Sequence, residues 1–313
     1  VDYLERRLSR RPGDRTALFQ LGEALARSGR RAEALAVWRQ IEAQEAFLAT
    51  AKYSAPDRLD VREHCFALAA EIAPAEPDIY LQWMEMYADE QVWEEVLRVF
   101  DVAASRGVHS ADISYQAGAA YWNIGRIALA EQQFERAIAL GPTYGLAYAQ
   151  LASLYWKEKG DEAGGLQVLE RYREASPRDP YPYYLIGRRF LKTGNPEEAL
   201  SYLLQAREFG MTTADLLERI GTAYYRLEAY ALAVDVLTSA LEAQEDELSR
   251  GIGVPLWRQA NVRVYLALSF WEMSDQNKAR EYACQALEIG EFGATIQDRL
   301  PQPLVQHCRE MRR

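Results

Sequence analysis

The sequence predicts an all-α fold, a solenoid of antiparallel helix pairs. The first observation is a small residue flanked by large ones, which recurs every 34 or 35 residues. The best-spaced of these positions are Gly118, Ala152, Gly187 and Gly221. The second is a small alanine twelve residues later, with a bulky residue four positions beyond it, as in Ala130 and Phe134. The third is apolar spacing of three, four and seven residues, which places one apolar stripe on each helix.

Small residues at fixed intervals imply close helix packing. Glycine or alanine at a crossing point lets two helices approach to the short end of the interaxial range of about 8–10 Å. A single helix pair cannot bury its apolar stripe, so neighbouring pairs must stack. We expect first helices to end in left-handed caps at Gly125 and Gly194, with Asn195 and Pro196 starting the next helix.

The chain divides into three predicted segments. Residues 1–13 are predicted to be the tail of a preceding or truncated repeat helix, because the sequence begins at Val1 inside a helical pattern. For the same reason we expect a piece cut from a longer protein. Residues 14–290 form the repeat array, and residues 291–313 form a C-terminal helix that caps the last repeat. About seven clear units start near residues 15, 77, 111, 145, 180, 214 and 260, with a degenerate unit at 46–76 and a long connector at 245–257.

Residues 14–290 resemble the tetratricopeptide repeat family, whose 34-residue unit follows the pattern W-x2-L-G-x2-Y … A-x3-F … A … P. The unit at 111–144 matches at Gly118, Tyr121, Ala130, Phe134, Ala137 and Pro142. The resemblance implies a right-handed superhelix in which the first helix of each unit lines the concave face. The Lys/Asn pattern of the family's carboxylate-clamp subclass is absent, which argues against a receptor for chaperone tails.

The predicted inner surface combines charge with aromatic residues. By register it is acidic near residues 78–112 and basic near residues 157–226. Aromatic side chains could pack a peptide while basic ones receive its acidic groups or terminal carboxylate. The candidate peptide-binding residues are Tyr115, Trp122, Asn123, Trp156, Lys157, Tyr184, Arg188, Lys192, Tyr225 and Arg226. The alternative is that these are solvated helix faces with scattered aromatic residues.

Composition excludes several classes of partner. The formal net charge of −10 argues against nucleic acid, whose phosphates require a basic surface. No apolar stretch is long enough to span a bilayer, so we expect no direct membrane insertion. These properties leave the compartment open: the cytoplasm is favoured, and a soluble domain of a membrane protein is the alternative.

The sequence carries no catalytic signature. It has no nucleophile elbow, Walker loop, HExxH or dinucleotide fingerprint, so we expect no enzyme, no catalytic residue and no cofactor. Cys65, Cys284 and Cys308 are far apart and odd in number, and we expect buried free thiols rather than disulfides. His64 and His307 each precede a cysteine, but adjacent helical residues diverge by about 100°, so we expect no metal site.

The leading hypothesis is a scaffold or adaptor that presents its concave groove to a protein or peptide ligand carrying acidic groups. The alternative is a regulatory or spacer repeat domain excised from a larger enzyme or membrane protein. Self-association through an uncovered apolar edge of the first repeat is left open. Catalysis by the repeats themselves is a third hypothesis, and no residue pattern supports it.

Overall fold

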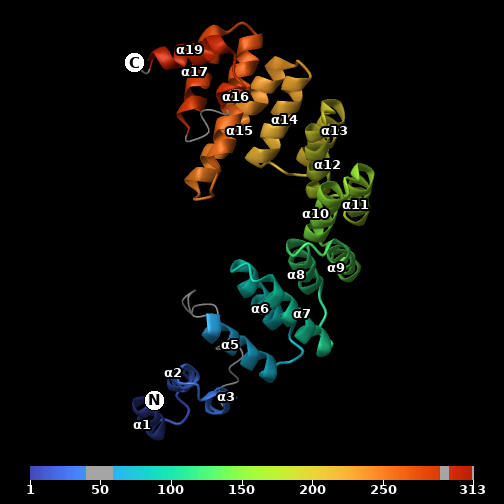
Figure 1. Ribbon diagram of the computed structural model, residues 1–313. Coiled ribbons are helices and arrows are strands. Elements are labelled where there is room, and N and C mark those ends of the chain that lie inside the picture. The colour runs from blue at the N-terminus through green and yellow to red at the C-terminus, as the bar shows by residue number, and fades with distance from the viewer. Residues whose placement is uncertain (40–58, 290–295, 312–313) are drawn as a thin grey trace. The chain divides into compact units, whose positions relative to one another are not determined.

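Helices and turns make up the parts of the chain that the structure describes, which are residues 1–39, 59–289 and 296–311. The computed structural model divides into two compact units, unit 1 (residues 1–162) and unit 2 (residues 163–313) (Figure 1). Both consist of stacked helix pairs, which confirms the predicted all-α repeat architecture. Residues 46–58 of the predicted degenerate unit, and residues 291–295 and 312–313 of the predicted capping segment, lie outside the described residues.

Unit 1 is a succession of short helices. They are α1 (Asp2–Arg10), α2 (Arg15–Arg27), α3 (Arg31–Arg39), α5 (Leu59–Ile72), α6 (Pro77–Asp89), α7 (Trp93–Ser105), α8 (Ala111–Asn123), α9 (Ile127–Leu140) and α10 (Gly145–Leu154), followed by the π-helical turn η1 (Tyr155–Lys159). Helices α2 and α3, α6 and α7, and α8 and α9 pack as pairs, and the first helices α6, α8 and α10 contact one another in turn. The first helices therefore share one surface of the unit.

Unit 2 repeats this arrangement. Its helices are α11 (Glu162–Ala175), α12 (Pro180–Thr193), α13 (Pro196–Glu208), α14 (Ala214–Arg226), α15 (Tyr230–Ser249), α16 (Leu256–Glu272), α17 (Gln276–Glu288) and α19 (Gln302–Met311). Helices α12 and α13, α14 and α15, and α16 and α17 form pairs, and the first helices α12, α14 and α16 are neighbours. Helix α19 packs on α17, the second helix of the last pair.

The small repeat positions lie at the helix crossings, as predicted. A methyl group added at Gly118 would lie 2.7 Å from the ring of Phe134, and one at Gly221 would lie 2.5 Å from Cγ of Leu237. Ala130 is fully buried at the matching position of the second helix. The spacing of small residues therefore records where two helix backbones come close.

The turns inside the pairs use left-handed backbone conformations. Gly125 has a φ of +75° and Gly194 a φ of +86°, which confirms the two predicted caps. The sequence did not predict that Gln91, Glu228 and Ser274 adopt the same conformation, with φ values of +58°, +60° and +63°. Residues with side chains pay a steric penalty in this region. The packing of two helices into a pair therefore requires this left-handed turn residue even where it is not a glycine.

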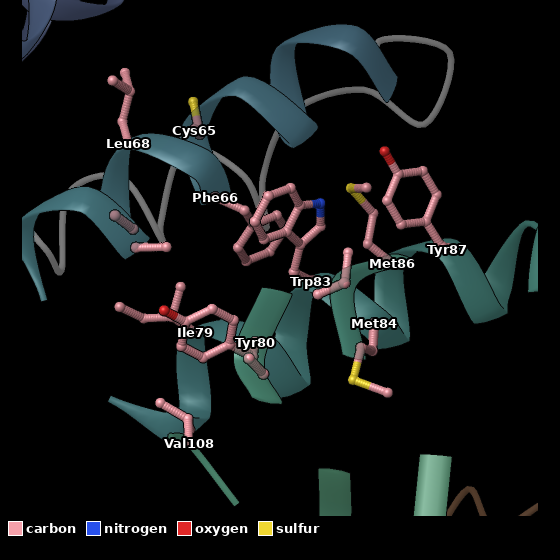
Figure 2. Packing of buried hydrophobic residues seen from close by; sticks show 14 of the residues in the cluster. Cys65, Phe66, Leu68, Ile79, Tyr80, Trp83, Met84, Met86, Tyr87 and Val108 are labelled. Atoms are coloured by element: carbon pink, nitrogen blue, oxygen red, sulfur yellow. The ribbon is translucent and has the colours of Figure 1, made fainter. Parts of the chain in front are cut away.

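Unit 1 contains an aromatic core between α5 and α6. The rings of Phe66 on α5 and Trp83 on α6 stack with centroids 6.3 Å apart (Figure 2). The guanidinium of Arg98, from α7, lies 5.5 Å from the Trp83 ring centroid and pairs with Glu63 at 2.7 Å. Burying each large apolar side chain contributes roughly 1.5–3 kcal/mol. The shortened repeat thus still supplies a packed core around α5.

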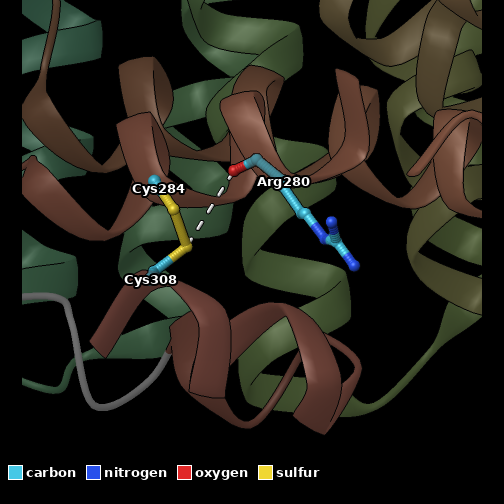
Figure 3. Close-up of a disulfide and its surroundings, with 3 residues drawn as sticks. All are labelled: Arg280, Cys284 and Cys308. Atoms are coloured by element: carbon cyan, nitrogen blue, oxygen red, sulfur yellow. Dashed lines mark hydrogen bonds between the residues drawn. A yellow bond between two sulfur atoms is a disulfide. The ribbon is translucent and has the colours of Figure 1, made fainter. Parts of the chain in front are cut away.

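The expectation that all three thiols are free is wrong for two of them. Cys284 on α17 and Cys308 on α19 form a disulfide with a Cα–Cα distance of 5.2 Å (Figure 3). Cys65 is free and buried, and burial raises the pKa of its thiol to about 12. Sequence spacing could not pair the other two, because the contact depends on α19 folding back onto α17.

Candidate peptide-binding surface

The candidate residues lie on the first helices of the pairs or on η1. In unit 1 they belong to α8 and η1, and in unit 2 to α12 and α14. Consecutive first helices contact one another within each unit, so each unit has its own inner surface built from these helices.

In unit 1 the structure brings Trp122 and Lys157 together. The Lys157 ammonium lies 5.5 Å from the Trp122 ring centroid, and the indole N–H donates to Glu158 Oε1 at 2.9 Å. Asn123 is exposed beside them and donates its amide to the carbonyl of Ala119. The π-helical turn supplies both partners of the tryptophan, and the sequence pattern gave no sign of it. Such turns are rare and occur frequently at functional sites.

The other two candidates in unit 1 are engaged in packing. Tyr115 is half-buried, with its ring edge-on to Tyr144 at a centroid distance of 5.6 Å. Trp156 is half-buried as well, and its indole N–H donates to the carbonyl of Glu162 at 3.3 Å. Both side chains therefore take part in packing within unit 1.

Carboxylates gather on the preceding part of this surface. Burial raises the pKa of Glu85 on α6, and repulsion from Asp89, Asp112 and Asp78 raises it further. Asp112 belongs to the neighbouring helix α8. Burial, together with the Asp112 carboxylate, also raises the pKa of Tyr144, which directly precedes α10. The acidic character predicted for residues 78–112 is therefore concentrated where α6 meets α8.

Tyr184 in unit 2 is a buried network residue rather than a surface ring. It is 8% exposed, and its hydroxyl donates to the carboxylate of Asp215 on α14. Arg219 donates to both Asp215 oxygens, at 3.0 and 3.1 Å, and to the tyrosine hydroxyl at 3.2 Å. Arg258 of α16 pairs with the same carboxylate at 3.1 Å. Although burial alone would raise it, these cationic partners hold the pKa of Asp215 below its usual value.

Three cations form what we call the basic strip, defined as Arg188 and Lys192 on α12 and Arg226 on α14. The Arg188 guanidinium lies 5.7 Å from the Tyr184 ring centroid. Arg226 donates to the carbonyl of Leu191 at 2.5 Å, which ties α14 to the end of α12. Within the described residues, none of the three makes an ion pair with a carboxylate. The strip therefore carries positive charge that unit 2 does not neutralise locally.

Tyr225 lies next to the strip in sequence and packs in an aromatic cluster. Its ring centroid is 5.7 Å from that of Tyr230 and 5.4 Å from that of Tyr265 on α16. Burial raises the pKa of Tyr225, and the nearby Glu272 raises it further. Of the candidates in unit 2, Lys192 and Arg226 are exposed, while Arg188 and Tyr225 are half-buried.

The sequence did not single out Glu218, which is the most perturbed carboxylate of this surface. It is 4% exposed, and burial raises its pKa to about 7. Asn261 donates to Oε1, while Oε2 lies 3.9 Å from Nε of Arg258 without a hydrogen bond in the described part of the chain. Arg299 in turn donates to the Asn261 carbonyl at 2.7 Å. Its burial is explained by the contacts with Asn261 and Arg258 of α16.

Residues 1–39, 59–289 and 296–311 contain no cluster of three or more histidine, cysteine or acidic side chains arranged to hold a metal ion. They also contain no helix with the length and apolar character needed to cross a bilayer.

Comparisons with known sequences agree with the repeat pattern. Residues 115–180 and 184–247 match the family model described as tetratricopeptide repeat. The tetratricopeptide repeat protein 21 homologues of Caenorhabditis briggsae and Caenorhabditis elegans are 31% and 30% identical to this chain over 107 residues. Each match covers 34% of this chain and 8% of the relative. The chain thus matches only a small part of the length of these curated relatives.

Solved structures show the same fold at low identity. The C-terminal part of a repeat-containing protein from Cytophaga hutchinsonii has a TM-score of 0.54 and 17% identity, covering 91% of this chain and all of that one. PilF of Pseudomonas aeruginosa has a TM-score of 0.55 and 15% identity, covering 71% of this chain and 95% of that one. Cut9, in its hetero-tetramer with Hcn1, has a TM-score of 0.54 and 15% identity, covering 95% and 58%.

Proposed function

We propose that this chain, which matches the tetratricopeptide repeat family model over residues 115–180 and 184–247, is a non-enzymatic protein-binding scaffold or adaptor whose unit 2 binds an acidic segment of a partner protein. The observation that carries this proposal is the basic strip of Arg188, Lys192 and Arg226. Its cations lack carboxylate partners among the described residues. Surface cations in this state favour a ligand of opposite charge.

The network of Tyr184, Asp215 and Arg219 favours binding because it helps to order the cationic side chains of the basic strip. Tyr184, Asp215 and Arg219 satisfy one another, so they do not compete for the cations above them. The Tyr184 ring supports the Arg188 guanidinium, and the Leu191 carbonyl fixes Arg226. Groups that are already ordered lose less entropy when a ligand binds. Guanidinium groups also bind carboxylates through paired hydrogen bonds.

Trp122 and Lys157 provide a second type of contact in unit 1. The indole is half-buried and retains partial exposure beside an exposed ammonium. A partly exposed aromatic ring next to a cation suits a ligand with an apolar side chain close to an acidic one. We include Trp122 and Lys157 as a second contact for an acidic segment of a partner protein. The carboxylates near Glu85 would repel acidic ligands from the neighbouring part of unit 1.

Charge reversal on the inner surface tests the proposal. A peptide array would contain acidic sequences and copies with every Asp and Glu replaced by Asn and Gln. The wild-type chain is expected to bind the acidic set selectively, and Arg188→Glu or Lys192→Glu to weaken binding by about tenfold, or about 1.4 kcal/mol. The matched control is Arg207→Glu, which makes the same charge change at an exposed residue of the second helix α13. Equal binding of both peptide sets, or equal loss in the control, would reject the strip.

The contact in unit 1 has its own test. Trp122→Ala is expected to weaken capture of a partner more than Trp156→Ala, because the Trp122 ring lies beside the exposed Lys157 ammonium, whereas the Trp156 indole N–H donates to a backbone carbonyl, that of Glu162. Affinity capture with both variants and with Arg188→Glu, followed by mass spectrometry, measures the effect. If all three capture every partner as the wild type does, neither inner surface is a binding surface.

A second candidate function is a regulatory or spacer repeat array within a longer protein. The observation in its favour is that the curated relatives match this chain over only 8% of their length. The nucleotide sequence on both sides of the segment that encodes residues 1–313 tests this second function. An open reading frame that continues past both ends would support this function, and a start codon directly before Val1 would oppose it.

A further inference from the structure

The last helix of unit 2 is attached to the array in two ways. Leu304 and Val305 of α19 are buried in the apolar core that α17 contributes to. The disulfide between Cys284 and Cys308 adds a covalent link between the same two helices (Figure 3). Nothing in the proposed binding function uses this link.

One cysteine of the pair is more exposed than the other. Cys308 is 2% exposed and its Sγ lies 3.9 Å from the carbonyl oxygen of Arg280, whereas Cys284 is partly exposed. Both cysteines line a surface hollow of about 500 Å³, whose wall also includes His307 and Met311. A hollow of this size admits the sulfur-bearing end of a dithiol. Because Cys284 is the more exposed residue of the two, its Sγ is the atom that we assign to attack by an incoming thiolate.

We propose that the Cys284–Cys308 disulfide is a redox-modification site, a covalent lock on the terminal cap α19 that a dithiol reductant opens. A thiolate of the dithiol attacks Cys284 Sγ, and the bond between the two cysteines breaks as Cys308 leaves and takes up a proton. The second thiol of the reductant then attacks the mixed disulfide. This releases Cys284 as a thiol and leaves the reductant as a cyclic disulfide. Two electrons and two protons pass from the dithiol to the protein.

Opening the lock changes the stability of the cap. The two cysteines are separated by 24 residues, and a link across a segment of that length restricts the open states of the chain. Its loss raises the opening equilibrium of α19 by on the order of 100-fold. Disulfides persist in oxidising surroundings and are reduced in the cytosol. The stability of the cap thus follows the redox state of the surroundings, independently of any ligand on the basic strip.

Counting thiols tests whether the bond exists in solution. The full chain is unfolded in denaturant, alkylated with iodoacetamide and analysed by mass spectrometry. One modified cysteine, Cys65, is expected without reductant, and three after treatment with dithiothreitol. In the folded, reduced protein Cys284 is expected to react first, while the buried Cys65 stays protected. Three modified cysteines without reductant would overturn the proposal.

Hydrogen exchange tests whether the bond locks the cap. Amides of α19 are expected to exchange about 100-fold faster in the reduced protein than in the oxidised protein, with amides of α12 unchanged as an internal control. The Cys284→Ser/Cys308→Ser variant is expected to behave like the reduced protein without any reductant. Identical α19 exchange rates in oxidised and reduced wild type would overturn the lock. A binding defect in Arg188→Glu with normal α19 exchange would separate this inference from the proposed function.

Discussion

The buried carboxyl group of Glu218 leads to a quantitative prediction of how the free energy of unfolding changes with pH. Its carboxyl group is buried between α14 and α16, with one oxygen bonded to Asn261 and the other facing Arg258 at 3.9 Å. Burial raises its pKa from 4.5 to about 7. The folded state therefore holds this proton over a pH range in which the unfolded chain has released it. Replacing the carboxyl with the neutral amide in Glu218→Gln removes the titrating group at nearly constant volume.

The sign of the pH dependence follows from that shift. Because the folded pKa is the higher one, the stabilising contribution is complete below about pH 4.5 and is lost as the pH rises through 7. Between pH 5 and pH 8 the wild-type free energy of unfolding should fall by roughly 2–3 kcal/mol from this group alone. Asp215 acts in the opposite direction, since its pKa is lowered, but only as the pH falls below its usual range. Measurements above pH 5 avoid that second effect.

Urea unfolding of the full chain at pH 5, 6, 7 and 8 measures the effect. Wild type should lose stability across the series, and Glu218→Gln should show a slope smaller by the amount assigned to Glu218. The control Glu242→Gln, at an exposed position of α15, should keep the wild-type slope. Carboxyl ¹³C NMR should locate a titration midpoint near pH 7 that disappears in Glu218→Gln. A shared slope for wild type and Glu218→Gln, or a midpoint near 4.5, would refute the reasoning.

Two further predictions concern the repeat geometry. Ala130→Leu should lower the free energy of unfolding by about 1–3 kcal/mol, because Ala130 is fully buried at a helix crossing, whereas Leu at the exposed Gln132 should change it by less than about 0.5 kcal/mol. Equal melting temperatures for these two variants would contradict the assigned register. Glu228→Gly should raise stability by up to about 1 kcal/mol, because it relieves a left-handed backbone at φ +60°. The same change at Glu242, inside α15, should lower it by about 1 kcal/mol, and thermal unfolding of both variants should show opposite shifts.

The helix crossings could be predicted well from the sequence because each one requires a small residue at a single position. Gly118 and Gly221 leave no room for a side chain, so their spacing reports the distance between successive crossings. The left-handed turn at Gly194 was predictable for the same reason. The turn at Glu228 was not, since its conformation comes from closure of the α14–α15 pair and no glycine marks it.

The proposed binding surface was less predictable because its chemistry depends on contacts between repeats. Register placed Tyr184 on the inner surface, but its burial comes from Asp215 and Arg219, which lie 31 and 35 residues further along the chain. The Cys284–Cys308 pair depends in the same way on how α19 returns to α17. Charge and spacing in the sequence predict which helix face a residue lies on. Contacts with residues of other helices then determine whether its side chain is buried or remains accessible to a ligand.

A double-mutant cycle tests the proposed binding surface most directly. The tightest acidic peptide from the array is compared with a copy in which one carboxylate is replaced by its amide, against wild type and Arg188→Gln. If that carboxylate contacts the strip, the losses in binding free energy should be non-additive, with a coupling of roughly 0.5–3 kcal/mol for at least one acidic position. Additive losses at every acidic position of the peptide would contradict binding at Arg188.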